Sequence, residues 1–141
     1  MLYNRPNIFF KKQGSWAPFF IRTITGVHLL YGVIDHVISA AKMQTFAQFL
    51  TQHNVFAPTL AAYVSIYMQF LAGVSYILGF YQRTSAFVMI IHFIFALLIV
   101  HIGDTYTHTF PALFMLAASI SLFFSGAGRL SIDQVKRRRR K

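Results

Sequence analysis

The sequence predicts an all-α integral membrane protein, a bundle of four helices that run up, down, up and down. The first reason is composition, because 56% of the residues are hydrophobic and only 11% are charged, against roughly 25% charged in soluble proteins. The second reason is the placement of charge, since nearly all of the 13 Lys and Arg residues lie toward the two ends of the chain. Such a chain cannot cover its surface with polar groups, so we expect lipid to be its solvent.

Four apolar segments have about the length that crosses a membrane. A helix needs about 20 mostly apolar residues to span a hydrocarbon layer of about 30 Å. Each segment should be helical, because backbone groups in lipid must find their hydrogen-bond partners within the segment. The predicted spans cover about residues 18–41, 60–81, 85–103 and 109–125.

The breaks between these segments carry residues that start or stop helices. Ala57-Pro58 precedes the second span, Gln82-Arg83-Thr84 separates the second from the third, and Gly103-Asp104 begins the next connection. Proline is tolerated in the first turn of a helix, and glycine commonly ends one. The fourth span therefore ends at Gly126.

The stretch over residues 42–55 differs from the spans. Its apolar residues, among them Met43, Phe46 and Leu50, recur near helical spacing between polar ones. This pattern predicts a short amphipathic helix that lies in the membrane interface. We expect it to connect the first two spans.

Basic residues predict which side of the membrane each connection faces. With four spans both termini lie on one side, and that side carries Lys and Arg at both ends together with Arg83. Because basic segments tend to stay in the cytoplasm, we expect both termini to be cytoplasmic. The chain then divides into a cytoplasmic N-terminal segment (residues 1–17), a transmembrane domain (18–128) and a basic cytoplasmic tail (129–141).

Basic side chains at this side are expected to contact anionic lipid headgroups. Arg22 stands near the start of the first span, from where a long side chain can extend to the headgroups. The tail ends in KRRRRK, and each basic residue near an anionic surface contributes about 1 kcal/mol. We assign Arg137, Arg138 and Arg139 to this role, and we do not expect nucleic acid as a partner.

Three polar side chains fall at a similar depth inside the predicted spans. At a rise of 1.5 Å per residue, His28, Gln69 and His92 lie roughly 10–14 Å into the layer. Each can be an isolated packing residue that hydrogen-bonds a neighbouring helix, which contributes about 0.6–2 kcal/mol. The alternative is that they line a cavity for a headgroup, a quinone or another small ligand, or that they handle protons.

A second polar group lies near the outer ends of the spans. Asp35 shares a helix face with His28, so we expect its side chain to face the bundle interior and to find a partner there. The expected partner is His36, His101 or a water molecule, and Asp104 completes the group. The alternative is that these side chains lie at headgroup level, in contact with water, without a further role.

The histidines raise the question of a metal or a haem. A metal site needs three or four converging ligands, and no spacing such as HExxH supports one, so we expect no metal. Haem b would need a pair such as His28 and His92 on neighbouring helices. Any four-helix chain with six histidines offers such a pair, so the sequence does not favour haem.

Three short stretches occur in a recognisable order. The first span holds Arg22, Gly26 and Gly32, LGFYQRTSA covers residues 78–86, and GAGRLSID covers residues 126–133. Together they resemble the DoxX-like family of small four-helix bacterial membrane proteins, whose motifs read R…G…G, LG…tR.aA and GpGrlSlD. The spacing agrees over nearly the whole chain.

The resemblance implies a multi-pass protein of the bacterial cytoplasmic membrane and, in some members, a membrane subunit of a redox complex. The relatives that give the family its name are tied to thiosulfate oxidation with electron transfer to quinone. Where the family often has a lysine after the second glycine, this chain has Asp35 and His36. Where the family often has an acid midway along the second span, this chain has Gln69.

These observations leave three functions open. The first is a membrane subunit or anchor of a quinone-linked redox complex. The second is a non-enzymatic accessory or assembly protein that binds another membrane protein, lipid or a second copy of itself through small-residue faces such as Gly26/Gly32 and Ala72/Gly73. The third is a small-molecule transporter, which four spans without a repeat pair favour less. Without cysteine or a nucleotide motif, the chain can be at most a non-catalytic or quinone-binding subunit of an oxidoreductase.

Overall fold

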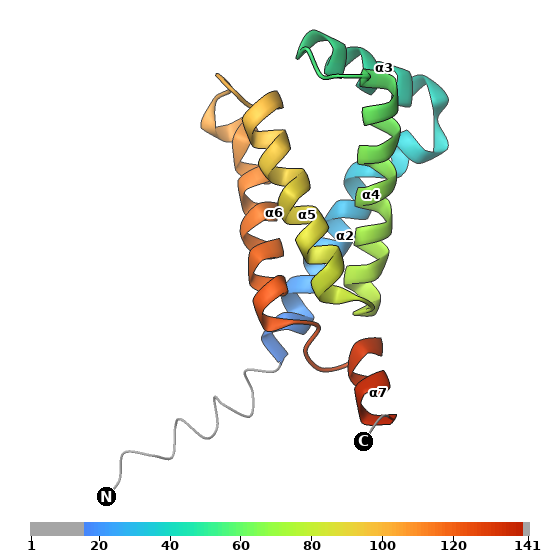
Figure 1. The fold of residues 1–141 in the computed structure, drawn as a ribbon, viewed down its shortest axis with the longest axis vertical. Coiled ribbons are helices and arrows are strands. Elements are labelled where there is room, and N and C mark those ends of the chain that lie inside the picture. Colours follow the sequence, from blue (N-terminus) through green and yellow to red (C-terminus); the bar gives the residue numbers. More distant parts are fainter. Residues whose placement is uncertain (1–15, 140–141) are drawn as a thin grey trace, which may run out of the picture.

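The computed structural model describes residues 16–139 as a bundle of helices (Figure 1). Within these residues, four helices are long and apolar enough to cross a membrane, and no strand occurs. The predicted all-α membrane bundle is therefore confirmed. Most of the predicted N-terminal segment, and the last two residues of the tail, lie outside the described residues. The membrane-crossing helices are α2 (Ala17–Ile38), α4 (Pro58–Leu78), α5 with its continuation η2 (Gln82–Val100), and α6 (Tyr106–Ser125).

The four helices form two hairpins. Helix α2 packs mainly on α4, and α5 packs mainly on α6. Figure 1 shows that the two hairpins meet at the end where α2 begins and where α7 (Ile132–Arg139) lies, and that they spread apart toward α3. Both ends of the described chain therefore lie at the same end of the bundle.

The predicted helix between the first two spans is present as α3 (Ala40–Gln52). Ser39 interrupts the helical path with an extended backbone, and its hydroxyl accepts a hydrogen bond from the Lys42 N–H at 3.4 Å. This arrangement is a typical N-cap. Helix α3 then buries one apolar side against α4, through Met43, Ala47 and Leu50.

Glycine allows α2 and α4 to approach closely. A Cβ atom added to Gly26 would lie 2.9 Å from the carbonyl oxygen of Gly73, and one added to Gly73 would lie 2.9 Å from the side chain of Leu30. Real side chains do not tolerate such distances. Of the small residues expected to face a partner protein, Gly26 and Gly73 therefore hold α2 against α4 within the chain itself, whereas a Cβ atom on Gly32 would meet nothing within 4 Å.

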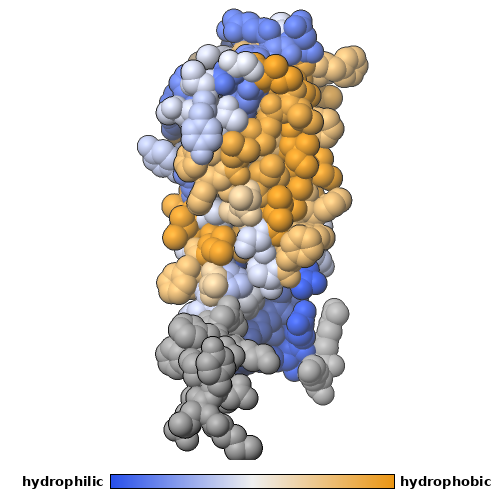
Figure 2. Space-filling view, turned by 90° about the vertical axis from the view of Figure 1, so that its left-hand side faces the viewer, coloured by the Kyte–Doolittle hydropathy of each residue, from blue (hydrophilic) through white to orange (hydrophobic). Residues whose placement is uncertain are grey.

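The outer surface of the bundle is apolar where the helices run and polar at both ends. Figure 2 shows this as an orange band between two blue zones. Large apolar side chains on this band are widely exposed, such as Ile24 at 63%, Leu71 at 66% and Phe124 at 74%. Because such a band would be costly in water, it is the surface expected to face lipid.

Candidate functional site

A cavity of about 600 Å³ lies where the two hairpins spread apart. Its lining comes from α2, α3, α4, α5, η2 and α6, so all four membrane-crossing helices contribute. Most of the lining is apolar, with Leu29, Phe93 and Met115 from the buried core and Phe46 and Leu50 from α3. A mostly apolar cavity with a few polar groups is the usual form of a small-molecule site.

His28, Gln69 and His92 all line this one cavity. Each comes from a different helix, namely α2, α4 and α5. The count of 1.5 Å per residue predicts a similar depth for all three. The sequence therefore indicated which polar groups would lie together, although it could not show the cavity between them.

These three side chains retain hydrogen-bonding capacity. The Gln69 amide nitrogen donates one N–H to the Ser65 hydroxyl at 3.3 Å, which leaves its second N–H as a donor and the amide oxygen as an acceptor. The His92 ring packs edge-on against Phe93, with ring centroids 5.2 Å apart. In residues 16–139, neither the His28 ring nor the His92 ring forms a hydrogen bond within the chain. Their nitrogens are free to bind a ligand in the cavity.

One wall of the cavity is a short π-helix. The third span changes from α5 to η2 (Ala96–Val100), and the His101 N–H donates to the Ala96 carbonyl at 3.1 Å, which is the i to i−5 pattern. Such turns are rare and frequently occur at functional sites. Ala96, Ile99 and Val100 of this turn face the cavity. Apolar periodicity cannot reveal a π-turn, and we did not predict it.

His101 and Asp104 form a pair where the cavity meets the outer end of the bundle. The His101 Nδ1 atom lies 2.9 Å from an Asp104 carboxylate oxygen, and His101 also lines the cavity. Both residues belong to the connection between η2 and α6. It places a titratable group that is partly exposed next to the cavity lining.

The prediction that Asp35 faces the bundle interior is wrong. Its carboxylate is 55% exposed and forms an ion pair with Lys42, and neither residue lines the cavity. The cause is the break at Ser39, which turns α3 so that Lys42 returns to the end of α2. Asp35 therefore has a partner on the surface rather than His36, His101 or a water molecule.

His36 has the more enclosed environment of the two neighbours. Its ring packs against Phe46 with centroids 5.6 Å apart, and its Nδ1 atom is buried without a partner. The four outer polar residues thus separate into a surface pair, a packed histidine and the His101–Asp104 pair. Among residues 16–139, no group of three or more His, Asp or Glu side chains is arranged to hold a metal ion.

The prediction that the Arg22 side chain extends to lipid headgroups is wrong. Its side chain is fully buried, and its guanidinium donates to main-chain carbonyls of two distant segments. One segment is the end of α4, where Tyr76 accepts at 2.8 Å and Ile77 also accepts. The other follows α6, where Ala127 accepts at 3.1 Å and Leu130 at 2.6 Å. Arg22 therefore joins the start of the bundle to its end.

Two more residues complete this junction. Gly79 has φ +63°, and a Cβ atom there would lie only 2.5 Å from the Ser131 Cβ atom. Asp133 accepts hydrogen bonds from the backbone N–H groups of Tyr81 and Gln82, both at 3.0 Å, and thereby caps the start of α5. Its own N–H donates to the Gly79 carbonyl at 3.1 Å.

The sequence model of the DoxX family matches residues 17–102. This chain belongs to the DoxX family. No curated protein and no solved structure was found to match it. The DoxX match covers α2 to η2, and so it includes Arg22, Gly79 and the three polar residues of the cavity.

The junction gives a physical reason for the three motifs of this DoxX protein. Arg22 from the first motif and Gly79 from the second both contact the third, the stretch over residues 126–133. These contacts lie at the α7 end of the bundle, away from the cavity (Figure 1). Arg22, Gly79 and the stretch over residues 126–133 therefore hold the fold together, whereas Gly32 of the first motif lines the cavity.

Proposed function

We propose that this DoxX protein is a membrane subunit of a quinone-linked redox complex of the bacterial cytoplasmic membrane, and that it binds the quinone headgroup in the cavity. The observation that supports this proposal is the meeting of His28, Gln69 and His92 on one largely apolar cavity. A charged ligand would find no opposite charge there. A neutral, lipid-soluble ligand with hydrogen-bonding groups fits better.

The chemistry of a quinone matches the lining. Its two carbonyl oxygens accept hydrogen bonds, which imidazole N–H and amide N–H groups donate. Its ring and isoprenoid chain are apolar and suit the walls formed by Phe46, Phe93 and Met115. The volume of about 600 Å³ lies within the roughly 300–1,000 Å³ common for small-molecule sites.

Electrons must come from a partner. Reduction of a quinone to a quinol takes two electrons and two protons, and the chain has no cysteine to carry thiol chemistry. We infer that another subunit supplies the electrons. The His101–Asp104 pair lies beside the cavity, and histidine is a common proton shuttle in proteins. This pair is therefore the proposed route for protons between the cavity and the outer face.

The structure supports the accessory function less well than the quinone-binding function. The small residues Gly26 and Gly73 are occupied by the contact between α2 and α4, so they do not form a free face for a partner helix. Gly32, the remaining glycine of that prediction, lines the cavity. A partner that delivers electrons must therefore bind by other surfaces.

Binding of a short-chain quinone tests the proposal. We expect decylubiquinone to bind the purified protein saturably, as measured by calorimetry in detergent. His92→Ala and Gln69→Ala should each weaken binding about fivefold to tenfold, because each removes a hydrogen bond of about 1 kcal/mol. The matched control is His108→Ala, an exposed histidine outside the cavity. Equal binding by all variants, or no saturable binding, would contradict the assignment.

A further inference from the structure

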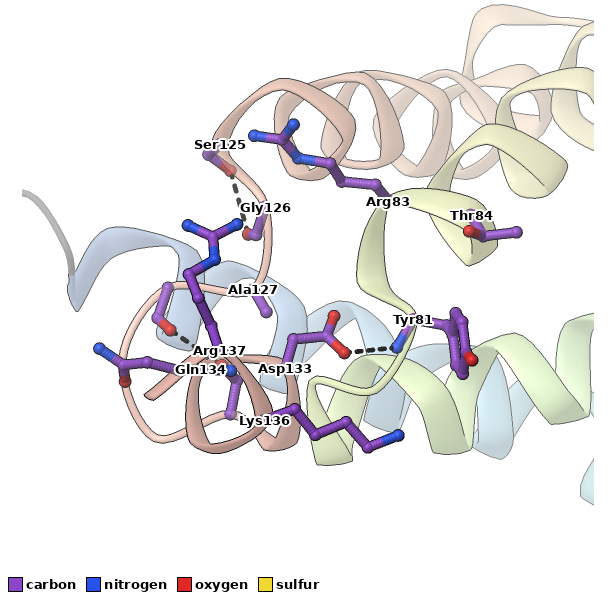
Figure 3. Close-up of a pocket in the computed structure, with 12 residues that line it drawn as sticks. Tyr81, Arg83, Thr84, Ser125, Gly126, Ala127, Asp133, Gln134, Lys136 and Arg137 are labelled. Carbon is purple, nitrogen blue, oxygen red and sulfur yellow. Dashed lines mark hydrogen bonds between the residues drawn. The ribbon is translucent and has the colours of Figure 1, made fainter. Parts of the chain in front are cut away.

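A second cavity, of about 680 Å³, lies at the opposite end of the bundle (Figure 3). It is bounded by the first residues of α5, by the turn that follows α6, and by α7. None of the residues that line it lines the quinone cavity. It is therefore a separate site, and nothing in the proposed function uses it.

The cavity is strongly basic. Arg83, Lys136 and Arg137 line it together with one acidic residue, Asp133. The three cations and one carboxylate leave a formal charge of +2 on the lining. The Asp133 oxygens already accept hydrogen bonds from the backbone N–H groups of Tyr81 and Gln82. The carboxylate is thus engaged at the start of α5, and the three cations lack an acidic partner in the cavity.

The basic side chains are positioned by contacts with their surroundings. The Lys136 ammonium lies 4.3 Å from the centre of the Phe80 ring and 5.4 Å from that of Tyr81. The Arg83 guanidinium donates to the Phe124 carbonyl at 3.4 Å. Figure 3 shows Arg83 and Arg137 extending from α5 and α7 toward the turn at Gly126. Two different elements thus direct positive charge into one space.

The position of the cavity indicates its ligand. Helix α4 ends at Leu78, α5 begins at Gln82 and α6 ends at Ser125, so the cavity lies where three membrane-crossing helices leave the apolar band. The surface beyond that band is polar (Figure 2). In a bilayer this level is occupied by headgroups, and the phosphate of a lipid is the anion present there at the highest concentration. Thr84 adds a hydroxyl to the lining, whereas the Ser125 hydroxyl already donates to the Ser121 carbonyl at 2.7 Å.

We propose that this cavity, lined by Arg83, Lys136 and Arg137, binds the phosphate group of an anionic lipid headgroup. Arg and Lys side chains form strong, charge-assisted hydrogen bonds with phosphate oxygens. The three neighbouring arginines of α7 differ in their relation to this cavity, although the sequence alone does not distinguish them. Arg137 lines the cavity, whereas Arg138 and Arg139 do not. The site is independent of the quinone proposal and stands if that proposal fails.

Native mass spectrometry of the delipidated protein in detergent provides the test. The protein is titrated with phosphatidylglycerol, with neutral phosphatidylcholine and, separately, with inorganic phosphate. We expect one saturable adduct with phosphatidylglycerol and none of comparable affinity with phosphatidylcholine. Lys136→Gln/Arg137→Gln and Arg83→Gln should each weaken the phosphatidylglycerol adduct on the order of tenfold.

The matched control removes the same charge from the next two positions. Arg138→Gln/Arg139→Gln should leave the adduct within about twofold of the wild type, because neither side chain lines the cavity and both act only through the screened general field. Equal weakening by both double variants would overturn the proposal in favour of a diffuse charge effect. Equal binding of phosphatidylcholine would also overturn it. If inorganic phosphate displaces the lipid at a similar concentration, the site binds free phosphate rather than a lipid headgroup, and the proposal is wrong.

Discussion

Arg22 shows how one buried side chain can connect the two ends of a membrane protein. It lies in the first span, yet its hydrogen-bond partners are carbonyl groups at the end of α4 and in the turn after α6. These carbonyls belong to a helix end and a turn, where helical N–H partners run out, and the Tyr76 carbonyl also accepts from the Gly79 N–H at 3.3 Å. The guanidinium satisfies several of them at once, since its donors form a planar fork.

We predict that Arg22→Lys destabilises the protein by about 2–4 kcal/mol. The shorter ammonium cannot reach both segments, so buried carbonyl groups lose their donors, at about 1–3 kcal/mol each. Thermal unfolding in detergent, followed by circular dichroism, measures the effect. Arg138→Lys is the control, because that side chain is exposed and such changes usually fall within about 0.5 kcal/mol. Equal melting temperatures for the two variants would show that the hydrogen bonds of Arg22 do not stabilise the fold.

At this scale the sequence predicted some positions and missed others. The depth of His28, Gln69 and His92 follows from helical rise alone, and these residues do share a cavity. The partners of Asp35 and Arg22 depend on segments that turn back after a break, namely α3 after Ser39 and the turn after α6. Periodicity along one helix carries no information about such a return. An arginine inside an otherwise apolar span was the available signal for Arg22.

The hairpin of α2 and α4 depends on small residues at the point of closest approach. Gly26 and Gly73 leave no space for a Cβ atom, while Gly32 on the same helix has open space within 4 Å. The two glycines of α2 therefore have different roles. Gly26 allows packing, and Gly32 lines the cavity.

Gly26→Ala should lower the free energy of unfolding by about 1–3 kcal/mol, because the added methyl group forces the two backbones apart. Gly32→Ala should be neutral or stabilising by up to about 1 kcal/mol, since alanine favours the helix and meets no neighbour. Denaturation in a mixed detergent system compares the two variants directly. A larger loss for Gly32→Ala than for Gly26→Ala would refute this assignment of roles.

The third span contains a feature of secondary structure that its amino-acid composition does not predict. Its apolar run is sufficient to predict a crossing helix, because lipid leaves the backbone no other partner. The change from α5 to η2 inside this span lies beyond such reasoning. It places a wall of the cavity next to His101, and so links the interior to the His101–Asp104 pair.

The two ends of the bundle differ in how closely the hairpins pack. At the α7 end the hairpins are held together by the junction of Arg22, Gly79 and Asp133. At the α3 end they spread, and the open cavity lies between them. The composition predicted the bundle, but it could not show which end is closed, because that depends on the tail returning to the start of the chain.

The orientation in the membrane can be tested because the chain contains no cysteine. Single cysteines at Gln52, Thr107 and Val135, all exposed positions, report on the two ends of the bundle. If both termini are cytoplasmic, as the basic residues predict, the first two should react with a membrane-impermeant maleimide in intact spheroplasts. Val135→Cys should react only after lysis. The reverse pattern would place the cavity between the hairpins toward the cytoplasm.

Photo-crosslinking with an azido-quinone most directly tests whether the cavity between the hairpins binds quinone. The reagent is bound to the protein in nanodiscs, irradiated, and the modified peptides are identified by mass spectrometry with and without excess unlabelled quinone. We expect competed crosslinks on α2, α4 and α5 near His28, Gln69 and His92, and a clearly lower yield after His92→Ala at a quinone concentration below saturation. Crosslinks confined to the outer apolar band, or unaffected by competitor and by the substitution, would contradict a quinone site in this cavity.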